Sequence, residues 1–138
     1  MSVPEQLAPS GLHEAVLYAD DLPAASAFYR DVVGLRIVLG PTPMLTALRV
    51  DAGSVVLLFD PERALEAGRD VPSHGTRGPG HIAFTVDDAA LTAVLGRCAA
   101  HDVPVEREIR WERGGRSVYV RDPAGNSVEF VVGEIWAP

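Results

Sequence analysis

The sequence predicts an α+β fold built from two tandem β-α-β-β-β modules, and three observations indicate it. His13 and His81 each open a short apolar segment that runs into an acidic turn and then an amphipathic helix. Each half of the chain continues with further strand-like segments separated by turn residues. A stretch rich in charge, glycine and proline, residues 61–78, separates the halves. With 138 residues, the chain is long enough for one domain, 1–138, with its own core.

The first module, about residues 11–60, is predicted to hold one helix and four strands. Asp20 or Asp21 can cap the helix, and Gly34 can end it in a left-handed conformation. Residues 51–53 have the composition of a hairpin turn between the last two strands. In chain order we expect a strand over 12–19, a helix over about 22–33, and strands over 35–39, 45–50 and 54–59.

The linker over 61–78 is predicted to contain one helical turn, and the second module, about residues 79–133, repeats the order of the first. Asp87 or Asp88 can cap its helix, and residues 122–125 form a tight turn between its last two strands. In chain order we expect a strand over 81–86, a helix near 88–101, and strands over 103–109, 117–122 and 126–132.

Composition excludes several classes of partner. The net charge is −7 and no basic stripe is visible, so we expect no nucleic acid. No apolar run has the length of a membrane span, and the first residues lack the regions of a signal peptide, so we expect no membrane and a cytoplasmic location. Cys98 is the single cysteine, which precludes an internal disulfide bond.

Candidate functional side chains collect on one face of the predicted strands, because side chains alternate across a strand. We expect His13 to share this face with Ala15 and Leu17. A carboxylate inside an apolar strand is costly unless a cation compensates its charge. Two imidazoles and one carboxylate form a set that holds a divalent metal and leaves other positions open to substrate. The face is predicted to carry His13, His81, Tyr119 and Glu129.

At these residues the chain resembles the vicinal oxygen chelate superfamily, which includes glyoxalases, extradiol dioxygenases, fosfomycin-resistance proteins and bleomycin-resistance proteins. The resemblance covers about residues 11–133 and lies in LHEAVLYADDLPAASAFYRDVVGLRIV, GHIAFTVDD and YVRDPAGNSVEFV. It implies that the two modules pair into a cupped mixed sheet, and that the protein is a homodimer. It also implies a divalent metal (Fe, Mn, Zn, Ni or Mg) with His13, His81 and Glu129 as ligands.

The chain departs from some members of that superfamily. Glyoxalase I has an acidic residue in the fourth strand of its first module, where this chain has Leu57. The three remaining ligands are closest to the site of extradiol dioxygenases, whose tyrosine corresponds to Tyr119. The histidine of the extradiol signature is absent from residues 110–113, and Ala15 stands where fosfomycin-resistance proteins have a threonine.

The sequence therefore predicts a metal-dependent enzyme that acts on a small molecule with vicinal oxygens. Tyr119 is the candidate catalytic group, as a hydrogen-bond donor, acid or base. Two alternatives stay open: a metal-free drug-binding protein of the bleomycin-resistance kind, and a transferase of the fosfomycin-resistance kind. The sequence also leaves open whether modules pair within one chain or between chains. The residues predicted to contact substrate are Trp111, Arg113, Arg121 and Leu57.

Overall fold

The computed structural model describes residues 7–138, so residues 1–6 of the predicted domain lie outside the described part. The described chain forms two four-stranded sheets, ordered β1-β4-β3-β2 and β5-β8-β7-β6. In each sheet the first and last strands of the module pair in parallel, and the other pairs are antiparallel. Neither sheet is closed, and together with the helices they confirm the predicted α+β fold. The strands are β1 (Glu14–Tyr18), β2 (Arg36–Leu39), β3 (Leu45–Asp51), β4 (Ser54–Phe59), β5 (His81–Thr85), β6 (Arg107–Arg110), β7 (Arg116–Arg121) and β8 (Ser127–Val132).

The helices begin at aspartate caps, as the sequence predicts. Asp21 caps α1 (Leu22–Phe28) and Asp87 caps α3 (Asp88–Ala100), each by accepting a hydrogen bond from the third residue beyond it. The predicted helix over 22–33 is not α-helical throughout, because its last turn, Tyr29–Val33, widens into a π-helix. The wider turn still buries Tyr29, Val32 and Val33 together.

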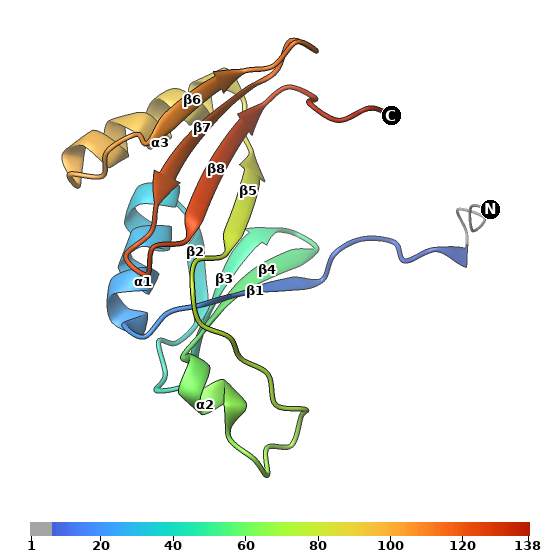
Figure 1. The fold of residues 1–138 in the computed structure, drawn as a ribbon, viewed down its shortest axis with the longest axis vertical. Helices are drawn as coiled ribbons and strands as arrows, with labels where there is room; N and C mark the ends of the chain where they lie inside the picture. Colours follow the sequence, from blue (N-terminus) through green and yellow to red (C-terminus); the bar gives the residue numbers. More distant parts are fainter. Residues whose placement is uncertain (1–6) are drawn as a thin grey trace.

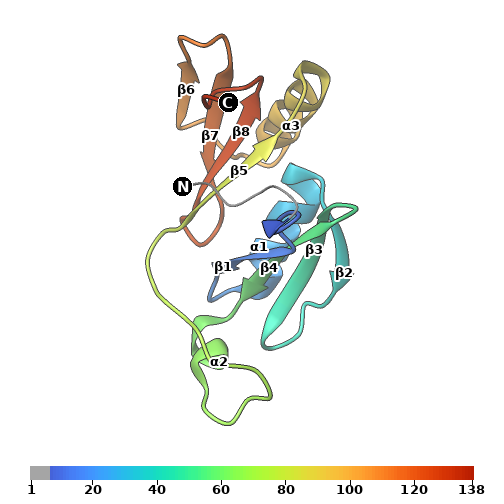
Figure 2. The ribbon, with the colours of Figure 1, turned by 90° about the vertical axis from the view of Figure 1, so that its right-hand side faces the viewer.

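One face of each sheet is covered by helices, and the other is not. Figure 1 shows α3 above α1 along one side of the two sheets, with α2 (Pro61–Leu65) below them in the linker. Figure 2 shows the sheets one above the other, joined by that linker. The core lies between the sheets and α1, η2 (the π-helical turn) and α3. Its largest fully buried apolar side chains are Tyr29, Leu48, Leu58, Leu91 and Phe130.

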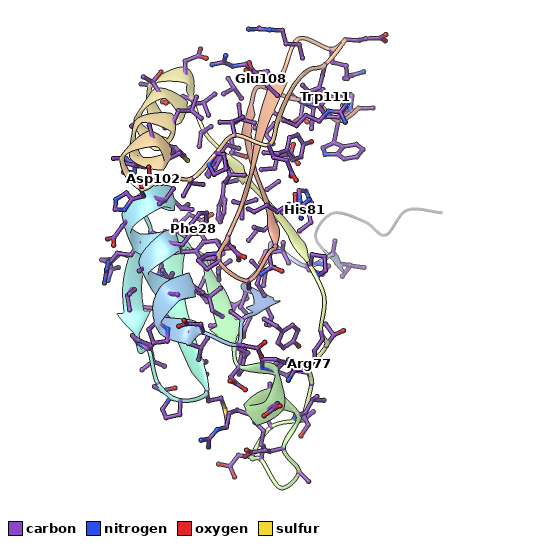
Figure 3. The ribbon with its side chains drawn as sticks, turned by 60° about the vertical axis from the view of Figure 1, so that its left-hand side comes forward. Phe28, Arg77, His81, Asp102, Glu108 and Trp111 are labelled. Carbon is purple, nitrogen blue, oxygen red and sulfur yellow. The ribbon has the colours of Figure 1, made fainter. Side chains whose placement is uncertain are left out.

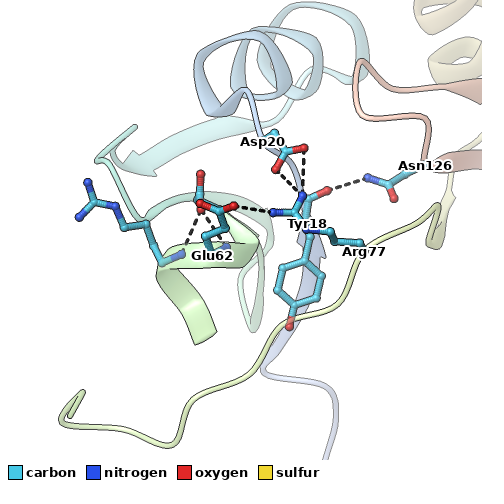
Figure 4. A network of polar contacts seen from close by, with 7 residues as sticks. Tyr18, Asp20, Glu62, Arg77 and Asn126 are labelled. Atoms are coloured by element: carbon cyan, nitrogen blue, oxygen red, sulfur yellow. Dashed lines mark hydrogen bonds and ion pairs between the residues drawn. The ribbon is translucent and has the colours of Figure 1, made fainter. Parts of the chain in front are cut away.

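The linker between the modules is held by polar contacts (Figure 4). Arg77 donates to Asp20 at the end of β1 and to Glu62 in α2, both at 3.0 Å. In the β7–β8 turn, the buried carboxylate of Asp122 accepts a 2.7 Å hydrogen bond from the hydroxyl of Tyr29. Asn126, in the same turn, donates to the backbone oxygen of Tyr18. These bonds connect the second module to the first.

The largest difference between a predicted and an observed strand boundary lies at the start of β6. The strand expected over 103–109 begins only at Arg107. The residues just before it instead form the C-terminal cap of α3. The backbone nitrogen of Val103 donates to the oxygen of Cys98, and the Val103 side chain packs on the core. No helix within residues 7–138 is long and apolar enough to cross a membrane.

Candidate metal centre

His81 and Glu129 meet on the open face of the second sheet. They lie on the neighbouring parallel strands β5 and β8, where Ala83 is the partner of Glu129 and Ser127 the partner of His81. His81 Nε2 lies 3.1 Å from Glu129 Oε1. The carboxylate is 7% exposed and the imidazole 51% exposed, so the pair has a buried and an open end. Figure 3 shows His81 on the side of the sheet away from the helices.

The imidazole is oriented by its other nitrogen. His81 Nδ1 lies 3.2 Å from the backbone oxygen of Ser127, which can only accept a hydrogen bond. When Nδ1 carries the proton, Nε2 presents a lone pair to Glu129 Oε1, which is also an acceptor. Histidine ligands of metals commonly donate their second nitrogen to a backbone carbonyl in this way. Two lone pairs 3.1 Å apart repel each other unless a proton or a cation lies between them.

The second oxygen of Glu129 is held by a chain of hydrogen bonds. Ser117 Oγ donates to Glu129 Oε2 at 2.5 Å, and Trp111 Nε1 donates to Ser117 Oγ at 2.8 Å. Ser117 is fully buried in β7, and Trp111 is half-buried in the turn that follows β6. Oε2 of the carboxylate is therefore held by Ser117, while Oε1 faces His81 and can contact a bound cation.

Tyr119 lies beside this pair. It is the cross-strand partner of Glu129, and its ring stacks on that of His81 with 6.3 Å between centroids. Partial burial and repulsion from the Glu129 carboxylate raise the pKa of the Tyr119 hydroxyl above its ordinary value. At neutral pH the hydroxyl stays protonated and can donate a hydrogen bond.

Within the described part of one chain, His13 is not grouped with His81 and Glu129, and Leu17, which was expected to share the open face with it, is buried in the core instead. Leu17 is buried in the core with its partner Leu58, so the alternate residues of β1, Glu14 among them, face the open side. His13 precedes β1 and follows the alternation of Leu17. The five-residue strands β1 and β5 pair in the same way with β4 and β8, which makes Glu14 the counterpart of His81.

The donors of the second module fit a divalent cation in part. Ligands about 2.1 Å from an ion, at right angles, lie about 3 Å apart, which matches the separation of His81 Nε2 and Glu129 Oε1. Within residues 7–138, however, no group of three His, Cys, Asp or Glu side chains gathers closely enough to hold an ion. Within the described residues, one chain thus brings together two candidate ligands, His81 and Glu129.

The predicted substrate residues are spread over several places. Trp111 lies against Ser117 on the open side (Figure 3), and Leu57 occupies the position in β4 that Glu129 occupies in β8. Arg121 lines a cleft of about 580 Å³ with Tyr119, but its guanidinium is bound to Glu106 and to the backbone oxygen of Gly125. Arg113 is exposed in the β6–β7 turn.

Sequence reasoning missed three residues of this face. Ser117 holds Glu129 by a hydrogen bond, and the sequence alone gave it no role. Arg107 on β6 is the cross-strand partner of Tyr119 and lines the same cleft. Glu14 was overlooked because His13 is the more familiar ligand. The signal that identifies Glu14 is the alternation of side chains along β1. If Leu17 is taken as a core residue, the residues that face the open side are those one and three positions before it, and the second of these is Glu14.

Comparison with protein families agrees with this architecture. A family model described as "Glyoxalase/Bleomycin resistance protein/Dioxygenase superfamily" matches residues 11–130. The chain is 31% identical to a lactoylglutathione lyase of Haemophilus influenzae over 121 residues, which cover 84% of this chain and 87% of that protein.

Solved structures show the same similarity. The crystal structure of a lactoylglutathione lyase from Agrobacterium tumefaciens has a TM-score of 0.84 and 44% identity, covering 94% of this chain and 98% of its own. A glyoxalase/dioxygenase from Nostoc punctiforme has a TM-score of 0.67 at 22% identity, covering 96% of this chain and 99% of its own, and it is similar in fold alone.

Proposed function

This chain belongs to the Glyoxalase/Bleomycin resistance protein/Dioxygenase superfamily, and we propose that it is a metal-dependent enzyme acting on a small molecule with adjacent oxygen atoms. The observation that carries the proposal is the facing of His81 Nε2 and Glu129 Oε1 at 3.1 Å, with the imidazole oriented by a backbone carbonyl. Glu129 Oε2 already accepts a hydrogen bond from Ser117. A cation beside Oε1 would therefore stabilise the remaining charge of this buried carboxylate.

The third ligand is assigned to Glu14 of a second copy of the chain. In one chain the open face of the first module carries Glu14, and that of the second carries His81 and Glu129. If the first module of one copy covers the second module of another, the three donors meet. This arrangement uses both open faces and makes the homodimer the functional unit.

The donor set favours Lewis-acid chemistry over oxygen activation. One imidazole and two carboxylates are harder ligands than the two imidazoles and one carboxylate of non-haem iron oxygenases. Such a set suits Mn²⁺, Mg²⁺ or Zn²⁺. We therefore propose a lyase- or isomerase-type reaction in place of ring cleavage, the reaction of the extradiol dioxygenases that the site resembles.

The residues around the pair have defined roles in this proposal. A divalent ion held there would polarise the adjacent oxygens of the substrate as a Lewis acid. Tyr119 keeps its proton at neutral pH and donates a hydrogen bond to a substrate oxygen. The cleft that Tyr119 shares with Arg107 receives the anionic part of the substrate. Leu57 forms an apolar wall and acts from the second copy.

Two relatives named lactoylglutathione lyase point to the thiol adducts of 2-oxoaldehydes as the first substrates to test. Leu57 stands where glyoxalase I has one of its carboxylates. In this proposal, Glu14 is therefore the carboxylate that the first module contributes to the site. Catechols and fosfomycin are the matched comparison substrates. Turnover of a catechol would favour the dioxygenase, and turnover of fosfomycin with a thiol would favour the transferase.

The ligand assignment is tested by loading purified variants with Zn²⁺ or Mn²⁺ and measuring bound metal. We expect Glu14→Gln, His81→Gln and Glu129→Gln to lose metal and His13→Gln to retain it. Loss in His13→Gln with retention in Glu14→Gln would move the third ligand to His13. A wild-type protein that binds no metal after loading, yet binds a bleomycin-type drug, would establish the metal-free binding function instead.

A further inference from the structure

We propose that Trp111 and Ser117 form a relay that positions Glu129, so that an indole outside the reaction centre sets how tightly the site holds its metal. The inference rests on the proposed function, because it concerns the ligand role of Glu129. Both residues are positioning residues that act through Glu129 and touch neither the ion nor the substrate.

The direction of each bond follows from the chemistry of its donor. An indole nitrogen can only donate, so Ser117 Oγ must accept the bond from Trp111 Nε1 at 2.8 Å. The single hydroxyl proton of Ser117 is then free for one acceptor, and Glu129 Oε2 lies 2.5 Å away. Trp111 thus fixes where the Ser117 proton points.

Burial makes the relay hard to replace by water. Ser117 is 0% exposed and Glu129 is 5% exposed. Within residues 7–138, no buried side-chain nitrogen or oxygen lacks a hydrogen-bond partner, so the network is complete. Removing the Ser117 hydroxyl would leave both the Trp111 N–H and Glu129 Oε2 without their partner.

The geometry divides the two carboxylate oxygens between two tasks. Tyr119 is the direct cross-strand partner of Glu129, and Ser117 lies two residues before it in β7, so the Ser117 bond draws Oε2 diagonally toward β7. Oε1 is left facing His81 on β5. Glu129 is thereby presented as a ligand through one oxygen, in a single orientation.

The turn after β6 holds the indole in place. The Trp111 backbone nitrogen donates to the oxygen of Gly115, and the Gly114 nitrogen donates to the oxygen of Trp111. Gly115 is required there, because an added Cβ would lie 2.6 Å from a methyl group of Ile135 and 2.9 Å from the backbone oxygen of Val132. This tight turn, the indole and the metal ligand form one connected unit.

The relay is tested first in metal-free protein by the indole N–H signals in NMR spectra. The chain has two tryptophans, so a Trp136→Phe variant assigns the Trp111 signal. We expect Ser117→Ala to move the Trp111 signal strongly, and Ser117→Thr, which keeps the hydroxyl, to move it little. Addition of Zn²⁺ to wild-type protein should shift the Trp111 signal and leave that of Trp136 in place.

Metal affinity, measured by calorimetry with Zn²⁺, is the second readout. We expect Ser117→Ala to weaken binding about 10- to 100-fold, Trp111→Phe to weaken it about 10-fold, and Ser117→Thr to restore it. Ser26→Ala is the matched control, since it removes a buried, hydrogen-bonded hydroxyl from α1, outside the proposed site. The dispersion of the NMR spectrum shows whether each variant is folded.

Two failures are distinguishable. Equal Zn²⁺ affinity in wild-type, Ser117→Ala and Trp111→Phe proteins would overturn the relay and leave the metal site standing. Absence of Zn²⁺ binding in wild-type protein would overturn the proposed function and the positioning role with it. A Trp111 signal that Ser117→Ala leaves unmoved would show that the indole does not donate to Ser117, which also overturns the relay.

Discussion

At the scale of single residues, Tyr119 is the side chain whose protonation matters most for the proposed reaction. Without a metal, partial burial and the Glu129 carboxylate raise the pKa of its hydroxyl, so the hydroxyl carries its proton at neutral pH. We predict that Tyr119→Phe lowers kcat about 100-fold with little change in metal affinity, because the variant loses only a donor to the reacting oxygen. Steady-state kinetics on the metal-loaded protein checks this, and an unchanged kcat would exclude Tyr119 from the chemistry.

The residues of the site also show where sequence reasoning succeeds and where it fails. His81, Tyr119 and Glu129 could be placed on one face because the strands around them alternate clearly. Glu14 could not, because Ala15 and Val16, on opposite faces of β1, are both apolar and both exposed, so burial along β1 does not alternate as it does along β5. Which of two adjacent residues faces the open side then depends on tertiary packing, and a shift of one residue exchanges the faces.

Among the elements, α3 packs on the first module through the core and is hydrogen-bonded to it through Arg97. Arg97 donates to the backbone oxygens of Val32 and Val33, at 2.8 and 3.1 Å, where the π-helical turn leaves carbonyls unpaired. We predict that Arg97→Gln lowers the free energy of unfolding by about 1–3 kcal/mol. Urea denaturation checks this against Arg110→Gln, an exposed arginine whose loss should change it by less than about 0.5 kcal/mol. Equal effects would show that Arg97 does not hold the elements together.

The same turn explains why element boundaries were harder to predict than element order. Gly34 marks the end of the helix correctly, with φ of 96°. Periodicity alone does not reveal that the turn before it widens, since the wider turn is favoured by burial of Tyr29, Val32 and Val33 against other elements. Likewise, Val103 reads as a strand residue but packs on the core beside Cys98.

For the molecule as a whole, the buried Tyr29–Asp122 pair makes the free energy of unfolding depend on pH in the alkaline range. Burial first, and then the Asp122 carboxylate, raise the pKa of Tyr29 far above its ordinary value of about 10. Below that value both the folded and unfolded chains keep the proton. Above it the unfolded chain releases its proton and the folded chain does not, so the free energy of unfolding falls as pH rises.

We therefore predict a steeper loss of stability between pH 9 and 11, measured by denaturation, in wild-type protein than in Tyr29→Phe. At neutral pH the variant should be less stable by about 1–3 kcal/mol, because Asp122 loses a buried donor. The other tyrosines are the same in both proteins, so the difference between the two curves isolates Tyr29. Parallel curves would show that Tyr29 is not held protonated by folding.

The proposed ligands are divided between the open faces of two modules. Mixing two inactive variants therefore tests whether the site is shared between two copies of the chain. Glu14 lies in the first module and Glu129 in the second, so Glu14→Gln and Glu129→Gln should each abolish metal binding as pure proteins. When the two variants are unfolded together and refolded as a mixture, about half of the dimers should contain one of each. In such a dimer one site carries both substitutions, and the other site is intact.

The mixture should therefore recover about a quarter of the wild-type metal and activity, although neither parent has any. Mixing Glu129→Gln with His81→Gln is the matched control, since both residues lie in the second module and no intact site can form. Recovery in the first mixture and none in the control would establish that modules pair between chains. No recovery in either, from proteins that each refold as dimers by analytical ultracentrifugation, would place the third ligand within the chain.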